Sequence, residues 1–204
     1  YGQRPHLGRL QSGKYLVTYR NVWGTPGSRA LVFDPNEHLG FQPTSYIVEE
    51  DRCALEHGAL TVRTSEGKRG AVEFDLYPAQ DDRSRVAIEA TLRVEDADRN
   101  GCAISAGCWV RFLPDRICLA DRPATGFAFD TRGWHTYRIV RENAAIAIYA
   151  DGQEKLRAPI GDIWAREVRF GNRGVTANRG LTHWRAVSAQ VRNADDTSID
   201  WRWT

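Results

Sequence analysis

The sequence predicts an all-β protein, an antiparallel β-sandwich, on three observations. Short runs of β-forming residues recur at regular spacing with turn residues between them, and no long stretch has a helical period. Asp151-Gly152 stands between two such runs, and Asp-Gly is a strong hairpin signal because both central residues of that turn need positive φ. The 204 residues suffice for one main domain with a sizeable core.

The first 40 residues read differently from the rest. Turns at 11–13 and 24–27 frame expected strands at 14–20 and 28–33. We therefore expect an N-terminal β segment over 1–40, either packed on the sandwich or belonging with something else, and the sandwich over 41–204.

The sandwich is expected to contain a succession of short strands with turns between them. Short helical turns are candidates only near 78–83 and 160–164. The predicted strands cover 59–64, 70–76, 85–94, 102–112, 116–120, 134–140, 145–150, 154–158, 167–171 and 184–191.

Residues 87–94 alternate clearly, which is typical of a half-buried strand with one wet or ligand-facing side. Glu89 and Arg93 share the polar side, and with Glu73 and Asp75 of a neighbouring strand they are candidates to line a concave face. The simpler interpretation is a solvated face with cross-strand charge pairs.

The segment 133–152 carries a resemblance to a known fold. Gly133-Trp-His-Thr-Tyr-Arg-Ile-Val140 followed by Ala-Ile-Ala-Ile-Tyr-Ala-Asp-Gly152 resembles the W-x-x-Y-x-I … I-x-V-Y-x-D-G hairpin of concanavalin A-like (laminin G-like) domains. The resemblance implies a jelly-roll sandwich that binds or processes glycans, without indicating a reaction.

The N-terminal pattern R-P-x-L-x-x-L-x-S-G-K-x-L-V-T-Y-R resembles one blade of a sialidase-type (BNR) propeller. It lacks the Ile between Arg and Pro and the Ser-x-Asp-x-Gly-x-x-Trp box of that family. The resemblance implies that Arg4 and Arg20 bind substrate in an active site completed by further blades.

Two interpretations make the sandwich itself an enzyme. Glycosidases need two carboxyl groups roughly 5 to 9.5 Å apart. Glu73 and Asp75 resemble the start of the Glu-x-Asp-x-x-Glu pattern of sandwich glycanases, but Pro78 stands where the third member is expected. Glu89 is therefore the alternative partner across the sheet. Polysaccharide lyases use a His or Tyr base, for which His135 is the candidate. Ordinary strand residues are the simpler interpretation.

A calcium ion is the one cofactor considered. Asp96 and Asp98 match the first half of an EF-hand loop, but Gly107 stands at its twelfth position. The alternative is a hairpin turn at Asn100-Gly101. No other cofactor is expected.

Carbohydrate recognition has three sets of candidates besides Arg93. A Gly-rich loop offers amide and guanidinium groups for sugar hydroxyls. The seven Trp residues offer flat faces, although most are expected to pack in the core; the closing segment 199–204 is either a last strand or an aromatic platform. The named candidates are Asn172, Arg173, Asn178, Trp109 and Trp201.

The four cysteines have no CxxC spacing, which argues against a zinc ribbon. Cys108 and Cys118 flank an expected hairpin and are either bridged or free and buried. Cys102 and Cys108 are placed on one extended strand.

Composition excludes several partners. A formal charge of +2 is too small for a nucleic-acid footprint, and no apolar run approaches the roughly 20 residues that span a bilayer. Phosphate loops, dinucleotide fingerprints and nucleophile elbows are missing. With no Met and a start at Tyr1, the chain is expected to be part of a longer polypeptide with further domains.

The expected function is therefore a carbohydrate-binding or architectural module, the C-terminal part of a secreted or periplasmic sialidase-like glycan-degrading enzyme. The alternative is that the sandwich is itself a glycoside hydrolase or polysaccharide lyase acting through Glu73, Asp75, Glu89 and His135. A third possibility is a structural interaction domain. The sugar, its linkage and the oligomeric state do not follow from the sequence.

Overall fold

The computed structural model describes residues 3–9, 11, 15–21, 27–33, 53–64, 72–76, 83–99, 101–160, 168–172, 179–193 and 198–203. The chain forms two compact units, Tyr1–Phe41 and Gln42–Thr204. Among the described residues, no helix is long and apolar enough to cross a membrane.

The N-terminal unit is a three-stranded antiparallel sheet in the order β1-β2-β3. Its strands are β1 (Gln3–Arg9), β2 (Tyr15–Asn21) and β3 (Gly27–Phe33). The bounds of β2 and β3 lie within one residue of the predicted ones, whereas β1 was not predicted as a strand.

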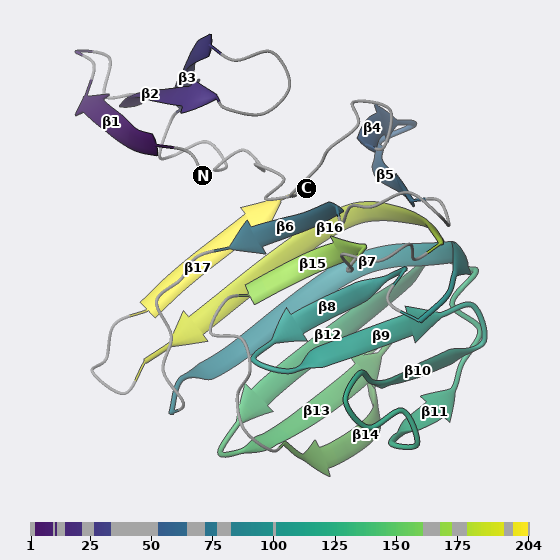
Figure 1. Ribbon diagram of the computed structural model, residues 1–204. Coiled ribbons are helices and arrows are strands. Elements are labelled where there is room, and N and C mark those ends of the chain that lie inside the picture. The colour runs from purple at the N-terminus through teal and green to yellow at the C-terminus, as the bar shows by residue number, and fades with distance from the viewer. Residues whose placement is uncertain are drawn as a thin grey trace. The chain divides into compact units, whose positions relative to one another are not determined.

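The larger unit is an antiparallel β-sandwich, which confirms the predicted fold class. Figure 1 shows its two sheets face to face, with the six-stranded sheet in front of the eight-stranded one. The six-stranded sheet has the order β11-β10-β9-β8-β15-β6, and the eight-stranded sheet has the order β14-β13-β12-β7-β16-β5-β4, with β17 also paired to β16.

The strands of the larger unit are short except for two long central ones, β7 and β16, which pair with each other in the eight-stranded sheet. Their bounds are β4 (Cys53–Glu56), β5 (Ala59–Thr64), β6 (Val72–Leu76), β7 (Arg85–Ala97), β8 (Ala103–Ala106), β9 (Trp109–Leu113), β10 (Arg116–Leu119), β11 (Gly126–Ala128), β12 (His135–Glu142), β13 (Ala145–Ala150), β14 (Gln153–Pro159), β15 (Val168–Asn172), β16 (Gly180–Arg192) and β17 (Ser198–Trp203).

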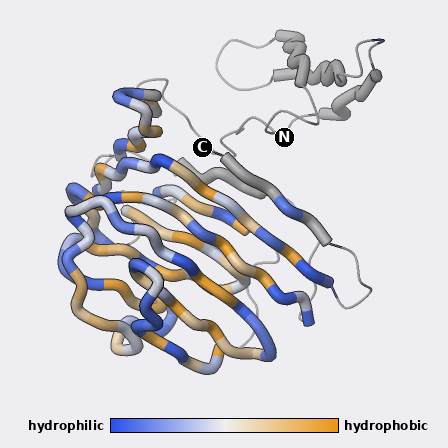
Figure 2. Tube along the Cα trace, turned by 180° about the vertical axis from the view of Figure 1, so that it is seen from behind, coloured by the Kyte–Doolittle hydropathy of each residue, from blue (hydrophilic) through white to orange (hydrophobic). Residues whose placement is uncertain are grey.

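The core lies between the sheets and follows from the alternation of apolar residues. Ile88 and Leu92 of β7 are fully buried, as predicted, and Trp184 of β16 packs on Phe170 of β15 with ring centroids 5.0 Å apart. Each such side chain stabilises the fold by roughly 1.5 to 3 kcal/mol. Figure 2 shows the resulting alternation of hydrophobic and hydrophilic residues along the strands.

The strands predicted over 134–140, 145–150 and 154–158 are confirmed as β12, β13 and β14. Asp151 and Gly152 have φ of 50° and 79°, as the predicted turn requires. The preceding turn, between β12 and β13, uses Asn143 and Ala144, which have φ of 51° and 58°.

The strand predicted over 102–112 is wrong, because these residues form the hairpin of β8 and β9. Ser105 pairs with Trp109 across it. Gly107 reverses the chain with φ of 98°, a conformation that favours glycine. The apolar residues on both sides of this glycine are all buried, so they give the same continuous pattern as a single buried strand.

The hairpin predicted at Asn100-Gly101 is also wrong. The segment joins β7 of the eight-stranded sheet to β8 of the six-stranded sheet, so the flanking strands do not pair. A side chain at Gly101 would collide with the backbone of Arg179. The position therefore requires glycine for close backbone contact.

The strands β4 and β11 were not predicted, and both helical-turn candidates fall largely outside the described residues. Cys102, Cys108 and Cys118 are buried and free. The bridge considered between Cys108 and Cys118 is therefore not formed.

Candidate functional site

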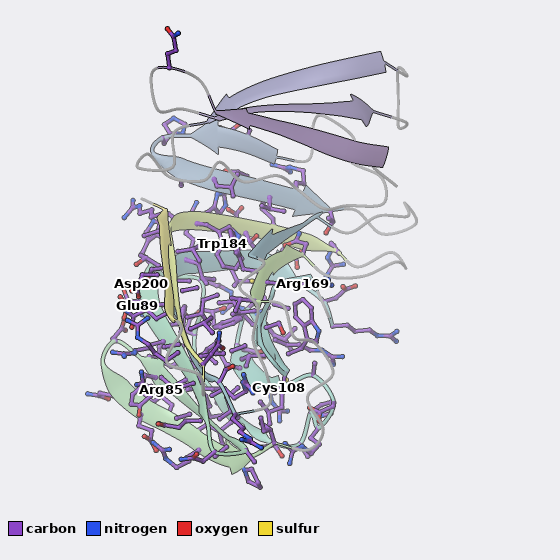
Figure 3. All side chains as sticks on the ribbon, turned by 90° about the vertical axis from the view of Figure 1, so that its left-hand side faces the viewer. Arg85, Glu89, Cys108, Arg169, Trp184 and Asp200 are labelled. Carbon is purple, nitrogen blue, oxygen red and sulfur yellow. The ribbon has the colours of Figure 1, made fainter. Side chains whose placement is uncertain are left out.

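The outer face of the eight-stranded sheet, which points away from the core, carries a groove of about 410 Å³. The groove crosses β7, β12, β13 and β14, and Figure 3 shows two of its residues, Arg85 and Glu89, on one side of the sandwich with Cys108 and Arg169 on the other. Its lining consists of Arg85, Glu89, Thr136, Arg138, Val140, Glu142, Ala145, Ala147, Tyr149, Gly152 and Arg157.

Strand register places four polar side chains in one row, and the first three of them line the groove. Glu89 lies opposite Arg138, Arg138 opposite Tyr149, and Tyr149 opposite Glu154. Directly opposed residues of antiparallel strands have Cβ atoms about 4.5 to 5.5 Å apart. The row is thus close enough for its members to contact a single ligand.

One end of this row is held by ionic hydrogen bonds. Arg157 donates from Nε and Nη2 to the two Glu154 carboxylate oxygens at 2.9 and 2.6 Å, and its Nη2 lies 3.3 Å from the Tyr149 hydroxyl. The hydrogen bonds from Arg157, and then from Tyr149, lower the pKa of Glu154 below its usual value. Glu154 is therefore a carboxylate at neutral pH, and Tyr149 is positioned by its neighbour.

The other end of the row has no such partners. Within the described part of the chain, neither Glu89 nor Arg138 forms a hydrogen bond or an ion pair, although the two are directly opposed. The nearby Arg85 does have a partner, since its Nε lies 3.5 Å from the Glu142 carboxylate. The groove therefore presents one free carboxylate and one free guanidinium group.

The structure separates the four residues expected to act together in catalysis. His135 is on the other side of β12 from Arg138: it shares the inner side with Tyr137, and both rings pack against Phe129 at 4.8 and 5.9 Å. Its Nδ1 lies 2.7 Å from the Asp151 carboxylate. His135 and Glu89 therefore do not share a groove.

The expected pairing of Glu73 and Asp75 with Glu89 across one sheet is wrong. Both precede β7 in the chain but lie on β6, which pairs with β15 at the edge of the six-stranded sheet. Strands adjacent in sequence are often adjacent in a sheet, and this rule fails here because the chain changes sheets between β6 and β7.

The expected sugar-binding residues are dispersed. Asn172 is 1% exposed, and its amide donates to Thr64 Oγ1 at 3.0 Å and accepts from Thr182 Oγ1 at 3.2 Å, so it supports the core. Trp109 is buried as well. Arg173 and Asn178 lie outside the described residues, Arg4 and Arg20 lie on β1 and β2, and Trp201 lies on β17, which confirms the strand interpretation of the C-terminal segment.

Asp96 and Asp98 bind a side chain and a backbone group of the protein itself. The Asp96 carboxylate lies 2.5 Å from Arg179 Nε, and Asp98 Oδ1 accepts the Arg179 backbone N–H at 2.9 Å. In the described part of the chain, no three His, Cys, Asp or Glu side chains are grouped to hold a metal ion. The two aspartates thus anchor the sheet-to-sheet connection to β16.

Tyr149 and Arg157 were missed by sequence reasoning, although a signal was present. The turn at Asp151-Gly152 fixes the register of β13 and β14, and the turn before it fixes that of β12 and β13. Following the alternation through both turns would have placed Arg138 and Tyr149 on the same side. Arg93 is confirmed on the same outer face as Glu89, and it lies over the Trp134 ring.

Comparison with known proteins places the fold. No protein-family model and no curated protein matches the sequence. Among solved structures, an alginate lyase from Corynebacterium sp. matches 90% of this chain and 96% of its own with a TM-score of 0.53 and 9% identity. The alginate lyase AlyC3 in complex with dimannuronate matches 87% and 89% with a TM-score of 0.50 and 11% identity.

A protein described as a sialidase matches 90% of this chain, at a TM-score of 0.50 and 12% identity, but only 21% of its own length. At such low identities these similarities show the fold alone. The larger unit is a jelly-roll β-sandwich, the fold that its sequence resemblance had implied.

Proposed function

We propose that this protein binds glycans in the groove on the outer face of the eight-stranded sheet. The observation that carries the proposal is the pair formed by Glu89 and Arg138, which are opposed across β7 and β12 without a partner in the described part of the chain. Charged groups left open in a concave site are available to a ligand.

The chemistry of this pair suits sugar hydroxyls. A carboxylate accepts hydrogen bonds from two neighbouring hydroxyls, while a guanidinium group donates up to five in a planar fork. Hydrogen bonds to charged groups are worth about 1.5 to 3 kcal/mol each. Recognition by Glu89 and Arg138 would therefore dominate the affinity.

The rest of the groove suits the apolar faces of sugar rings. Val140, Ala145 and Ala147 provide a shallow apolar floor, Gly152 leaves one end open, and the Tyr149 ring is a candidate stacking surface. The alginate lyases that share the fold act on a polysaccharide, which is consistent with this class of ligand.

A lyase activity is the second candidate, favoured by Tyr149 lying opposite Arg138. Arg138 would neutralise a uronate carboxylate, and the phenolate oxygen of Tyr149 would accept the proton from the adjacent carbon. The C–O bond on the next carbon would break as a C=C bond forms, and the Tyr149 hydroxyl just formed would return the proton to the leaving glycosidic oxygen. This assignment replaces His135, which lies on the other side of the sheet, as the candidate base.

We also propose that the sandwich is part of a larger enzyme. A secreted or periplasmic glycan-degrading enzyme, with sialidase-like blades preceding the sandwich, accords with the propeller-blade resemblance of residues 1–40. Extending the chain at its N-terminus and measuring sialidase activity would test it.

Proton NMR of a mixed panel of neutral, uronic and sialylated oligosaccharides tests the proposal. We expect the wild-type protein to broaden the signals of the oligosaccharides that it binds. We expect the apparent affinity of Arg138→Ala to be at least about tenfold lower. Arg132→Ala is the matched control, because Arg132 is an exposed arginine away from the groove that pairs with Asp130.

Equal binding by both variants would refute the groove as the site. Line-broadening without new sugar signals over a day would establish a binding module for those sugars. New unsaturated-sugar signals that disappear in Tyr149→Phe would establish the lyase.

A further inference from the structure

We infer that the same sheet face holds a second ligand site, built from Arg93, Trp134 and Arg185, that binds the oxyanion of an acidic glycan, either a carboxylate or a sulfate ester. The glycan part of this inference rests on the proposed function. The anion site itself does not, because it follows from the local geometry of β7 and β16.

Two β-bulges shape this end of the sheet. Leu181 pairs with Asp96 and Thr182 with Val94, so Glu95 is an extra residue on β7. Trp184 pairs with Leu92 and Ala186 with Thr91, so Arg185 is an extra residue on β16.

Bulges redirect side chains and are over-represented beside functional sites. Both extra residues, Glu95 and Arg185, project into one cluster around Trp134 and His183. Two bulges thus converge on one cluster, and this geometry does not depend on the charges of the side chains.

Trp134 holds two guanidinium groups in place. The Arg185 guanidinium lies 3.9 Å from the centroid of the indole ring, and that of Arg93 lies 5.6 Å away. Stacking on an aromatic face orients a guanidinium group while leaving its in-plane N–H donors free. Arg185 makes no hydrogen bond or ion pair with the described residues, so its donors are open to a ligand.

The charges of the cluster leave room for one more anion. The Glu95 carboxylate is shared, with the same oxygen 3.1 Å from His183 Nε2 and 3.6 Å from Arg93 Nη2. The other ring nitrogen of His183, Nδ1, forms a hydrogen bond with Thr61 Oγ1 at 3.1 Å. Among the described residues, the cluster thus has one carboxylate for two guanidinium groups, and an oxyanion would complete the balance through charge-assisted hydrogen bonds.

The position of this cluster fits an extended acidic chain. Arg93 and Glu89 are four residues apart on β7, which corresponds to about 13 Å along a strand. An oligosaccharide lying along β7 would reach both the groove and the cluster, whereas a monosaccharide would reach only one.

The first test follows the Trp134 indole N–H resonance, assigned with Trp134→Phe, while sodium sulfate or sodium acetate replaces chloride at constant ionic strength. We expect a saturable shift in the wild-type protein and at least about tenfold weaker binding in Arg185→Gln. The two anions distinguish sulfate from carboxylate preference. Arg192→Gln is the matched control on β16, where Arg192 pairs with Asp200.

Arg185→Lys separates fold from recognition, because it keeps the charge but loses the planar fork. A dispersed spectrum with weakened anion binding in this variant supports the site. A shift that is linear in anion concentration, or equal in Arg185→Gln and Arg192→Gln, overturns it.

The second test compares acidic with matched neutral oligosaccharides. Two results together support both the groove and the anion site. Arg185→Gln loses the preference for acidic oligosaccharides, and Arg138→Ala weakens the binding of acidic and neutral oligosaccharides alike. Saturable anion binding at Trp134 without any effect of Arg138→Ala on glycans refutes the groove and leaves the anion site standing. Glycan binding unaffected by Arg185→Gln, together with no saturable anion shift, refutes the anion site alone.

Discussion

The groove and the bulged cluster occupy the same face of the eight-stranded sheet, but they are built differently. In the groove, the pairing of β7 with β12 is regular, so Glu89 and Arg138 stand opposed, and neither has a partner among the described residues. In the cluster, the pairing of β7 with β16 is interrupted twice, and Glu95 contacts both His183 and Arg93.

The difference shows what strand regularity does to side chains. A regular ladder sets its side chains in parallel rows that point the same way. An extra residue rotates its side chain out of the row and lets it meet those of neighbouring strands. The regular pairing of β7 with β12 therefore offers separated charges to a ligand, while the bulged pairing of β7 with β16 makes preformed contacts.

The largest effect is expected from removing the support beneath the bulged cluster. Trp184 lies between His183 and Arg185 in sequence, is fully buried, and donates from Nε1 to Thr182 Oγ1 at 2.9 Å. We expect Trp184→Ala to lower the free energy of unfolding by about 3 to 5 kcal/mol, because it leaves a cavity and removes this bond.

Chemical denaturation measures this change, with Trp184→Phe as the conservative control. In Trp184→Ala, the contact of Arg185 with Trp134 should be lost. Substitution of Arg138 should still weaken glycan binding. A loss below about 1.5 kcal/mol would mean that the cluster is supported from elsewhere.

A smaller effect should distinguish the two carboxylates on β7. Glu95→Gln removes the charge that faces His183 and Arg93, so we expect a loss of about 0.5 to 1 kcal/mol in the free energy of unfolding. Glu89→Gln removes no partner within the described residues and should change the free energy of unfolding by less than about 0.5 kcal/mol. Equal losses in urea denaturation at low salt would contradict the contrast between the two regions.

The smallest effect concerns the turn at the end of the groove. Partial burial raises the pKa of Asp151, but the hydrogen bonds with His135 and the Thr136 backbone N–H lower this pKa by more, so it lies below the usual 3.8. A lowered pKa stabilises the fold above the unfolded value, and this contribution is lost as the pH falls through the folded pKa.

Because Asp151 is half exposed, we expect only a few tenths of a kcal/mol. The measurement is the free energy of unfolding of the wild type and Asp151→Asn between about pH 6 and pH 3. The variant should be less stable near neutrality and should converge with the wild type in acid. Parallel pH curves would show that the turn does not depend on this carboxylate.

The sequence was sufficient for the fold class and for most strands of the sandwich, because alternation in segments such as 87–94 and the Asp151-Gly152 turn are local signals. It was insufficient for sheet membership. Nothing local distinguishes β6, which belongs to the six-stranded sheet, from a neighbour of β7, and so Glu73 and Asp75 were grouped with Glu89.

The candidate site was predicted only in part for the same reason. Glu89 and Arg93 were placed on the correct face by alternation. Asn172 and Trp109 have the chemistry of sugar-binding residues, but burial and internal hydrogen bonds depend on tertiary packing. The bulges at Glu95 and Arg185 arise from a mismatch between two distant strands, which a single strand's pattern does not contain.

Cys102, Cys108 and Cys118, which are buried and free, give this protein an internal reporter of its own opening. Burial raises the pKa of the Cys108 thiol to about 12, and burial likewise raises that of Cys102 and Cys118. Thiol reagents attack the thiolate, so the closed sandwich should resist them at neutral pH. The rate at which such a reagent modifies these cysteines would therefore measure how often the two sheets separate, without any engineered label.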